Sequence, residues 1–191
     1  MIDKASQAAA IRLLALEARS GKIGFVIFEG PARLLDWGVL GCAEPTSHLR
    51  SVVERRVRPL LFRYRPLAVV MRRDNHYSLQ SPSRLRVSIR AIKREAHRCE
   101  VEFRLLKTKS RKRFFVQFGR SAKHQIAALT AQLFEEIYWR AQPERKAWHS
   151  ESYHTVIFDA AATGLVAFAD EFDPDAVKEL VATRESFRRL P

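Results

Sequence analysis

The chain has few of the residues that build disulfide-rich, membrane-spanning or nucleotide-cofactor proteins. Its two cysteines, Cys42 and Cys99, lie far apart and outside any Cys-x-x-Cys pair, so the sequence predicts neither a disulfide framework nor a thiolate zinc site. Its seven glycines form no Gly-rich phosphate loop. No apolar run approaches the ~20 residues of a membrane span. We therefore expect a cytoplasmic protein with no membrane partner, associated with the nucleoid if the cell is prokaryotic.

Positive charge is what the chain has in excess. The formal net charge is +13, from 34 Lys and Arg against 21 Asp and Glu. Residues 84–113 hold twelve basic residues against three acidic ones, whereas residues 170–191 hold six acidic residues against four basic ones. Arg-rich clusters favour a nucleic-acid partner, although the positive electric field that they create also attracts an anionic membrane surface.

The hydrophobic pattern predicts strands first. Apolar, β-prone runs at 11–18 and 22–29 are divided by Arg19-Ser20-Gly21, which is typical of a hairpin. A third run at 33–40 completes an antiparallel meander. The short apolar run at 67–71 is typical of a buried strand that lies parallel to its neighbour.

Helices and strands alternate after the meander. Helical spacing of apolar residues covers 46–64, and residues 83–98 form a basic amphipathic helix that precedes a strand at 101–106. This order predicts an α/β domain built on a mixed sheet. We expect three segments: a leader at 1–10, one domain over 11–169, and an acidic helical tail over 170–191.

The stretch from Lys107 to Arg113 is predicted as a charged loop that contacts phosphate. The alternative is a solvated hairpin tip whose charges keep an edge strand soluble. The basic helix that precedes it favours phosphate contact. The candidate nucleic-acid-binding residues are Arg86, Arg90, Arg94, Lys107, Lys109, Arg111, Lys112 and Arg113, with Lys123 at the start of a helix predicted over 121–138.

Two acidic residues are candidates for a catalytic or metal-binding role. Asp159 stands at the start of a helix of small residues, where a carboxylate can reach a metal or a phosphate; alternatively it only caps that helix. Glu17 ends the first apolar strand, where a charge needs water, a partner or a metal. A metal ligand and a strand-end acid paired with an arginine are both open for Glu17.

Four segments, in this order, resemble the RuvC-type Holliday-junction resolvases of the RNase H-like superfamily. They are Leu13-Leu14-Ala15-Leu16-Glu17, Pro66-Leu67-Ala68-Val69-Val70, Gly119-Arg120-Ser121-Ala122-Lys123-His124-Gln125-Ile126 and Asp159-Ala160-Ala161. The resemblance implies an RNase H-like mixed sheet, a three-strand meander followed by parallel strands and flanked by helices. It also implies Glu17 and Asp159 as ligands of Mg²⁺ or Mn²⁺, a DNA rather than an RNA partner, and a homodimer.

The sequence departs from that family at the positions where the family carries acidic metal ligands. The strand that should end in a second acid continues as Met71-Arg72-Arg73, with Asp74 as the nearest carboxylate and the third candidate catalytic residue. Ala162 stands where the late helix should carry another Asp. Glu17 and Asp159 alone make a poor cage for a divalent cation, because Mg²⁺ demands near-octahedral oxygen ligation.

Three functions follow from these observations. The first is a RuvC-like protein that binds structured or branched DNA, with weakened or absent nuclease activity and a weakly held metal. The second is an active metal-dependent endonuclease in which Asp74 or Asp36 completes the site. The third is a scaffold or regulatory subunit whose basic face binds an acidic protein. The position of a third carboxylate relative to Glu17 and Asp159 separates them.

Overall fold

The first three strands form the expected meander in the computed structural model, which describes residues 11–73, 83–140, 153–172 and 174–187. β1 (Arg12–Arg19) pairs antiparallel with β2 (Lys22–Glu29), and β2 pairs antiparallel with β3 (Arg33–Gly41). Gly21 turns the first hairpin at φ +82°, a left-handed conformation that glycine adopts without strain. The predicted leader at 1–10 lies outside the described residues.

Two parallel strands extend the sheet on the other side of β1. β4 (Ala68–Arg73) pairs parallel with β1, and β5 (Glu102–Lys107) pairs parallel with β4. The strand order is β3-β2-β1-β4-β5, which confirms the predicted mixed sheet. The carboxyl ends of β1, β4 and β5 therefore meet at one edge of the sheet.

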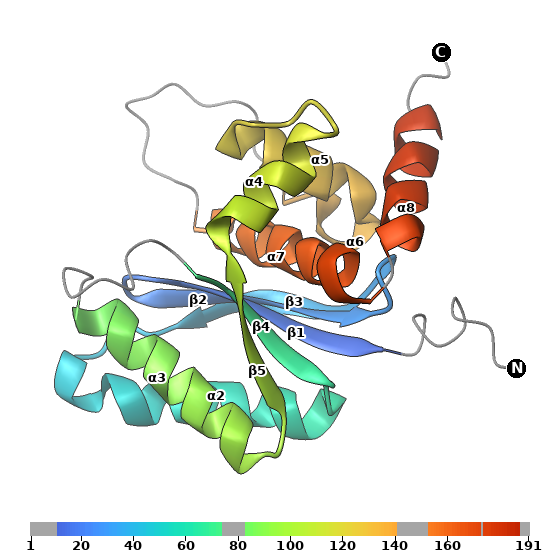
Figure 1. Ribbon diagram of the computed structural model, residues 1–191. Helices are drawn as coiled ribbons and strands as arrows, with labels where there is room; N and C mark the ends of the chain where they lie inside the picture. The colour runs from blue at the N-terminus through green and yellow to red at the C-terminus, as the bar shows by residue number, and fades with distance from the viewer. Residues whose placement is uncertain (1–10, 74–82, 141–152, 173, 188–191) are drawn as a thin grey trace, which may run out of the picture.

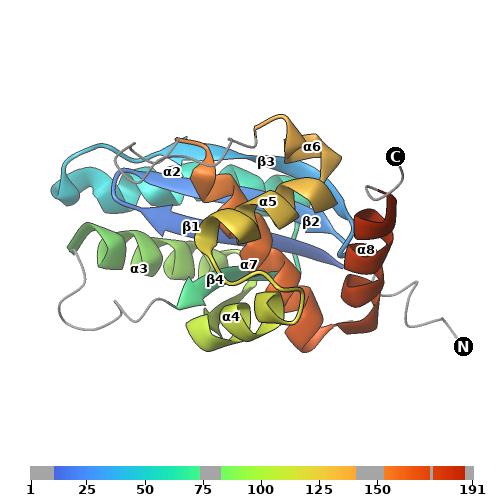
Figure 2. The same cartoon turned by 90° about the horizontal axis from the view of Figure 1, so that it is seen from above.

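Helices cover both faces of the sheet (Figure 1). The helices under one face are α2 (Thr46–Tyr64) and α3 (Ser83–Arg98). The other layer contains α4 (Thr108–Val116), α5 (Lys123–Leu133), α6 (Glu135–Tyr138), α7 (Thr155–Glu171) and α8 (Pro174–Phe187). Seen from above, α7 runs across the sheet and α8 stands at its end (Figure 2). No helix in the described ranges is long and apolar enough to cross a membrane.

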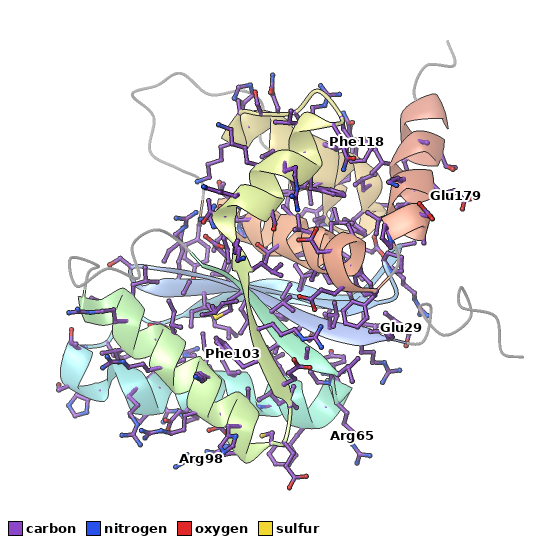
Figure 3. All side chains as sticks on the ribbon, in the orientation of Figure 1. Glu29, Arg65, Arg98, Phe103, Phe118 and Glu179 are labelled. Carbon is purple, nitrogen blue, oxygen red and sulfur yellow. The ribbon has the colours of Figure 1, made fainter. Side chains whose placement is uncertain are left out.

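Strand alternation divides the core into two clusters. On β1, Leu13 and Ala15 face α7, whereas Leu14 and Leu16 face α2 and α3, as the period of two along a strand requires. Figure 3 shows the side chains that fill both layers, with Phe103 between the sheet and α3. The tail helix α8 joins the α7 side of the core through buried residues of one face, Val177 and Val181.

Two glycines let α7 lie close to the sheet. A Cβ on Gly24, in β2, would stand 2.4 Å from the backbone oxygen of Val156, and a Cβ on Gly164, inside α7, would stand 2.1 Å from Phe28 Cε2. Both distances are far shorter than any tolerated contact. Because Gly24 is paired with Glu17 in the sheet, its missing side chain brings the first turns of α7 over the end of β1.

Three sequence predictions are corrected by the structure. The stretch from Lys107 to Arg113 is not a loop, because α4 begins at Thr108 directly after β5. The helix expected over 121–138 is broken at Phe134 into α5 and α6. The late helix begins at Thr155 with His154 as its N-cap, so Asp159 lies one turn inside α7 and does not cap it.

Candidate functional site

Glu17 and Arg72 lie side by side on adjacent parallel strands. β1 and β4 are in register with Leu16 opposite Met71, so the next residue of each strand points to the α7 face. Arg72 Nη2 donates to Glu17 Oε1 over 2.7 Å. Arg19, two residues further along β1 and therefore on the same face, places Nη2 3.0 Å from the same oxygen.

Asp159 meets these residues from above the sheet. It is 3% exposed, and its two carboxylate oxygens are paired with cations from three different elements. Arg111 Nη2, from α4, donates to Oδ1 over 2.8 Å, and Arg19 Nη2 donates to Oδ2 over 3.0 Å. Lys123 Nζ, at the start of α5, lies 3.6 Å from Oδ2.

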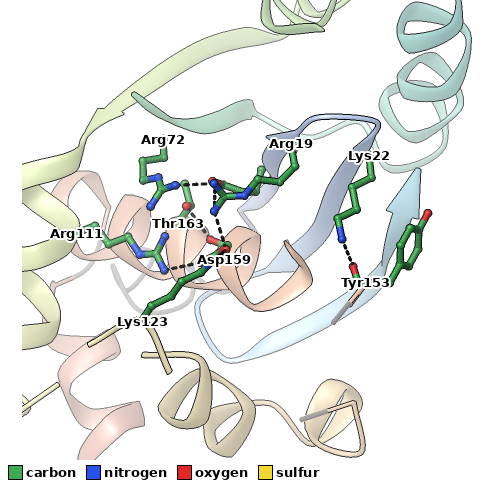
Figure 4. A network of polar contacts seen from close by, with 9 residues as sticks. Arg19, Lys22, Arg72, Arg111, Lys123, Tyr153, Asp159 and Thr163 are labelled. Atoms are coloured by element: carbon green, nitrogen blue, oxygen red, sulfur yellow. Dashed lines mark hydrogen bonds and ion pairs between the residues drawn. The ribbon is translucent and has the colours of Figure 1, made fainter. Parts of the chain in front are cut away.

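These side chains form one network, in which Arg19 joins the two carboxylates (Figure 4). We call it the ion-pair cluster; its members are Glu17, Arg19, Arg72, Arg111, Lys123 and Asp159. Residues from β1, β4, α4, α5 and α7 thus converge at the carboxyl edge of the parallel strands. In open α/β sheets, ligands bind at this edge.

The pKa values of the two carboxyl groups are shifted in opposite directions. Burial raises the pKa of Glu17 to about 7, and the charge of Asp159 adds to this, while Arg72 and Arg19 oppose it. Burial also acts to raise the pKa of Asp159, but the charges of Arg111 and Lys123 outweigh it and hold that pKa below its ordinary value. Asp159 is therefore the permanently ionised member of the pair at neutral pH.

The residues of the ion-pair cluster do not fit a divalent cation. Each carboxylate already has two or more cationic partners within 3.6 Å, and Arg72 supplies a positive charge where a further ligand would be needed. Within the described part of the chain, no group of three or more His, Cys, Asp or Glu side chains could hold a metal. A dication here would lack ligands and be repelled by the guanidinium groups.

No third carboxylate from the described part of the chain joins Glu17 and Asp159. Asp74 lies outside the described residues. Asp36 accepts a hydrogen bond from the hydroxyl of Tyr64, at 2.7 Å, and Tyr64 belongs to α2 on the opposite face of the sheet. Asp36 therefore cannot complete a site with Glu17 and Asp159. Ala162 is fully buried in the apolar core beneath α7.

The predicted nucleic-acid-binding residues divide between two helical layers. On the α7 side of the sheet the exposed basic residues are Lys107 at the end of β5, Lys109, Lys112 and Arg113 on α4, and Lys123 at the start of α5. Arg86 is partly buried and Arg90 and Arg94 are exposed, all on α3 in the other layer. Arg111 differs from its neighbours because it is buried and turned toward Asp159.

Sequence reasoning found two of the four cationic residues of the ion-pair cluster, Arg111 and Lys123, and missed the other two. Arg19 and Arg72 are partners of Glu17, but neither was among the predicted site residues. A signal was present: along β1 the residues at 15, 17 and 19 share a face, and Arg72 follows the buried Met71 in β4. The meeting of Arg111 with Asp159, 48 residues away, has no comparable local signal.

Solved structures with a similar arrangement of elements include Holliday-junction resolvases. A Thermus thermophilus RuvC in complex with a Holliday junction substrate has a TM-score of 0.60, with 18% identity over 82% of this chain and 91% of that one. The chain has the RuvC-type resolvase fold. A second T. thermophilus RuvC structure gives a TM-score of 0.60 at 19% identity, over 82% of this chain and 92% of that one.

The RuvC-type fold also matches a eukaryotic protein. The yeast mitochondrial Holliday junction resolvase Ydc2 has a TM-score of 0.57 and 14% identity, over 93% of this chain and 86% of that one. No protein-family profile matches the sequence, and no curated protein matches it. The fold predicted from the four sequence segments is thus confirmed by structural similarity, while the identities are too low to carry more than the fold.

Proposed function

We propose that this protein binds branched or otherwise structured DNA and cleaves it slowly or not at all. The observation that carries the proposal is the ion-pair cluster: guanidinium groups lie against both carboxylates at the edge of the sheet where the RuvC-type resemblance implies metal ligands. A two-metal phosphodiesterase needs free carboxylates to hold its cations. Here those carboxylates are neutralised by Arg72, Arg19 and Arg111.

The choice of DNA as partner rests on charge and on the fold neighbours. The net charge of +13 gives a field that attracts a polyanion, and exposed basic residues on α4 lie directly after the carboxyl end of β5. One of the solved neighbours is a RuvC in complex with a Holliday junction substrate. A four-way junction is therefore the first DNA to test. A homodimer and a cytoplasmic location belong to the same proposal.

We expect Mg²⁺ or Mn²⁺ to bind only weakly, and DNA binding does not need it. Among the residues that the structure describes, Glu17 and Asp159 are the ones that would hold it, after displacement of their cationic partners. The pKa of Glu17 is raised to about 7, so at neutral pH Glu17 carries a proton in about half of the molecules. This proton further lowers the affinity of the site for a cation.

A competition experiment tests this function. A labelled four-way junction is titrated with the protein in EDTA and again in Mg²⁺, each time with an excess of unlabelled linear duplex of the same base composition. We expect the junction to be retained against the duplex, with the same affinity in both buffers. Equal competition by linear duplex removes the preference for branched DNA, and binding only in Mg²⁺ restores the endonuclease alternative. Absence of binding at low salt favours the scaffold alternative.

A further inference from the structure

The ion-pair cluster carries more positive charge than its carboxylates neutralise. Among its six residues, three guanidinium groups and one ammonium group face two carboxylates, so the cationic groups outnumber the carboxylates by two. The excess lies at the carboxyl edge of parallel strands, partly shielded from water, where an electric field is stronger than at an open surface. Such a place attracts an anion.

Arg111 has hydrogen-bond donors that the described residues leave unused. Its side chain is 8% exposed, and its Nη2 donates to Asp159. Its Nε and Nη1 are buried and have no hydrogen-bond partner within the described part of the chain. A buried donor without an acceptor is unfavourable, and a guanidinium group presents its donors in a fork that matches the oxygens of a phosphate.

The cluster is open to solvent on one side. The side chains of Arg19 and Lys123 are 32% and 41% exposed, whereas those of Arg72 and Arg111 are 15% and 8% exposed. An anion that arrives from solvent therefore meets Arg19 and Lys123 first. Figure 4 shows Arg19, Lys123 and Arg111 approaching Asp159 from different directions.

We propose that the ion-pair cluster is a phosphate-binding site that holds one phosphodiester of the DNA backbone without a metal ion. The inference rests on the proposed function and adds its ligand. The guanidinium and ammonium groups neutralise the phosphate in place of metal ions. Unlike metal ions, they supply no bound water to attack the phosphorus atom. Arg19 and Lys123 bind the phosphate oxygens, and the more deeply buried Arg111 donates from a nitrogen that has no other acceptor, Nε or Nη1, while its Nη2 stays on Asp159.

The central test removes the two exposed cations and leaves the buried ones in place. Binding of a four-way junction in EDTA is measured against salt for the wild type, for Arg19→Gln with Lys123→Gln, and for the control Arg184→Gln. Arg184, in α8, is similarly exposed at 38% and is also ion-paired, with Glu135. We expect the double variant to bind about tenfold more weakly, with a log-log salt slope smaller by about 1, the value for one lost phosphate contact. The control should keep both wild-type values.

The outcomes separate this inference from the proposed function. If the wild type binds the junction and the double variant binds it with unchanged affinity and slope, the phosphate site is wrong and the proposed function stands. If the wild type binds no DNA, the proposed function fails and the inference with it. Thermal unfolding of each variant shows whether weaker binding reflects loss of the fold.

A second measurement is made on the wild-type protein, and one variant serves only to assign a signal. The Nε–H signals of arginines in ¹⁵N-labelled protein are followed during titration with thymidylyl-thymidine, which carries one phosphodiester, and separately with inorganic phosphate, at constant ionic strength. Arg111→Lys assigns the signal of Arg111. We expect the Arg19 and Arg111 signals to shift with the dinucleotide. A shift with inorganic phosphate alone contradicts the phosphodiester assignment, and no shift with either contradicts the site.

Discussion

Arg72 Nη2 lies 2.7 Å from Glu17 Oε1, across two parallel strands whose register fixes both residues on the α7 face of the sheet. The RuvC-type resemblance places an acid near the end of β4, and here that place holds the strongest cationic partner of Glu17. A second carboxylate would draw a metal to Glu17. Here Arg72 donates to the Glu17 carboxylate, so a side chain of the protein neutralises the charge that a metal ion would otherwise neutralise.

Loss of Arg72 should destabilise the protein, because it leaves a buried carboxylate with fewer partners. We expect Arg72→Gln to lower the free energy of unfolding by about 2–3 kcal/mol, somewhat below the usual cost of breaking a buried ion pair because Arg19 remains. Arg98→Gln is the control, since Arg98 also contacts two carboxylates but is 50% exposed; we expect it to cost less than about 1 kcal/mol. Urea unfolding of both variants measures the difference, and equal costs would contradict the assigned role of Arg72.

Glu17 should give the protein an unusual dependence of stability on pH. Its pKa is about 7 in the folded chain against 4.5 as the ordinary value, so the folded state binds more protons between these limits. The free energy of unfolding therefore falls as pH rises from about 4.5 to about 7, by about 3 kcal/mol for this group alone. Its contribution is fully present below 4.5.

Other groups titrate in or near this range, so the pH test compares two proteins. Burial, with the charges of Arg140 and Lys22, lowers the pKa of His154; this makes stability rise with pH as His154 loses its proton, opposite to the effect of Glu17. Asp159, whose pKa is lowered, loses its contribution only in more acidic solution. Urea unfolding of wild type and Glu17→Gln from pH 5 to 8 isolates the Glu17 term. Identical pH profiles would show that the pKa of Glu17 is not raised.

The close approach of α7 to the sheet should depend on Gly24. An added Cβ would stand 2.4 Å from the backbone oxygen of Val156, which belongs to the first turn of α7 and cannot rotate away. We expect Gly24→Ala to cost about 2–3 kcal/mol, as overpacking of a core does. Gly41→Ala, also in a strand but with 3.8 Å to its nearest neighbour, should be close to neutral. If the two variants unfold at the same temperature, the packing of α7 described here is wrong.

The exposed basic residues of α4 should contribute to DNA binding without regard to sequence. Lys112→Glu with Arg113→Glu changes the charge by four units, and so does the control, Lys178→Glu with Arg184→Glu on α8. If about six phosphates are contacted, the wild-type affinity should fall as salt rises, with a log-log slope of about −5. The α4 variant should bind all DNA sequences more weakly than the α8 control does. Equal loss in both variants would indicate attraction by net charge alone.

Much of the fold was predictable because it is encoded locally. The continuous apolar runs of β1 and β2, with Gly21 between them, predict a hairpin, and the continuous run in β4 predicts a strand buried on both faces. The helix α4 was not predicted because its charged residues suggested a loop. Its buried residues, Arg111, Phe114 and Phe115, do recur at helical spacing, but an arginine was not counted as an inward-facing position.

The candidate site was only half predictable for a physical reason. Glu17 and Asp159 stand out because each carries a charge in an apolar element. Their partners come from four elements, and which arginine meets which carboxylate depends on strand register and helix packing between residues as far apart as Arg19 and Asp159. The sequence contains too many arginines for composition to choose among them.

Incubation of a four-way junction with Mg²⁺ or Mn²⁺ tests the central claim most directly. Purified wild type, Glu17→Gln and Asp159→Asn are compared at protein concentrations that saturate the junction, and the DNA is resolved on denaturing gels. Because the arginines already neutralise both carboxylates, we expect the wild type to bind the junction and to leave it intact, like both variants. Robust metal-dependent cutting by the wild type that both substitutions abolish would contradict the account and establish an active endonuclease.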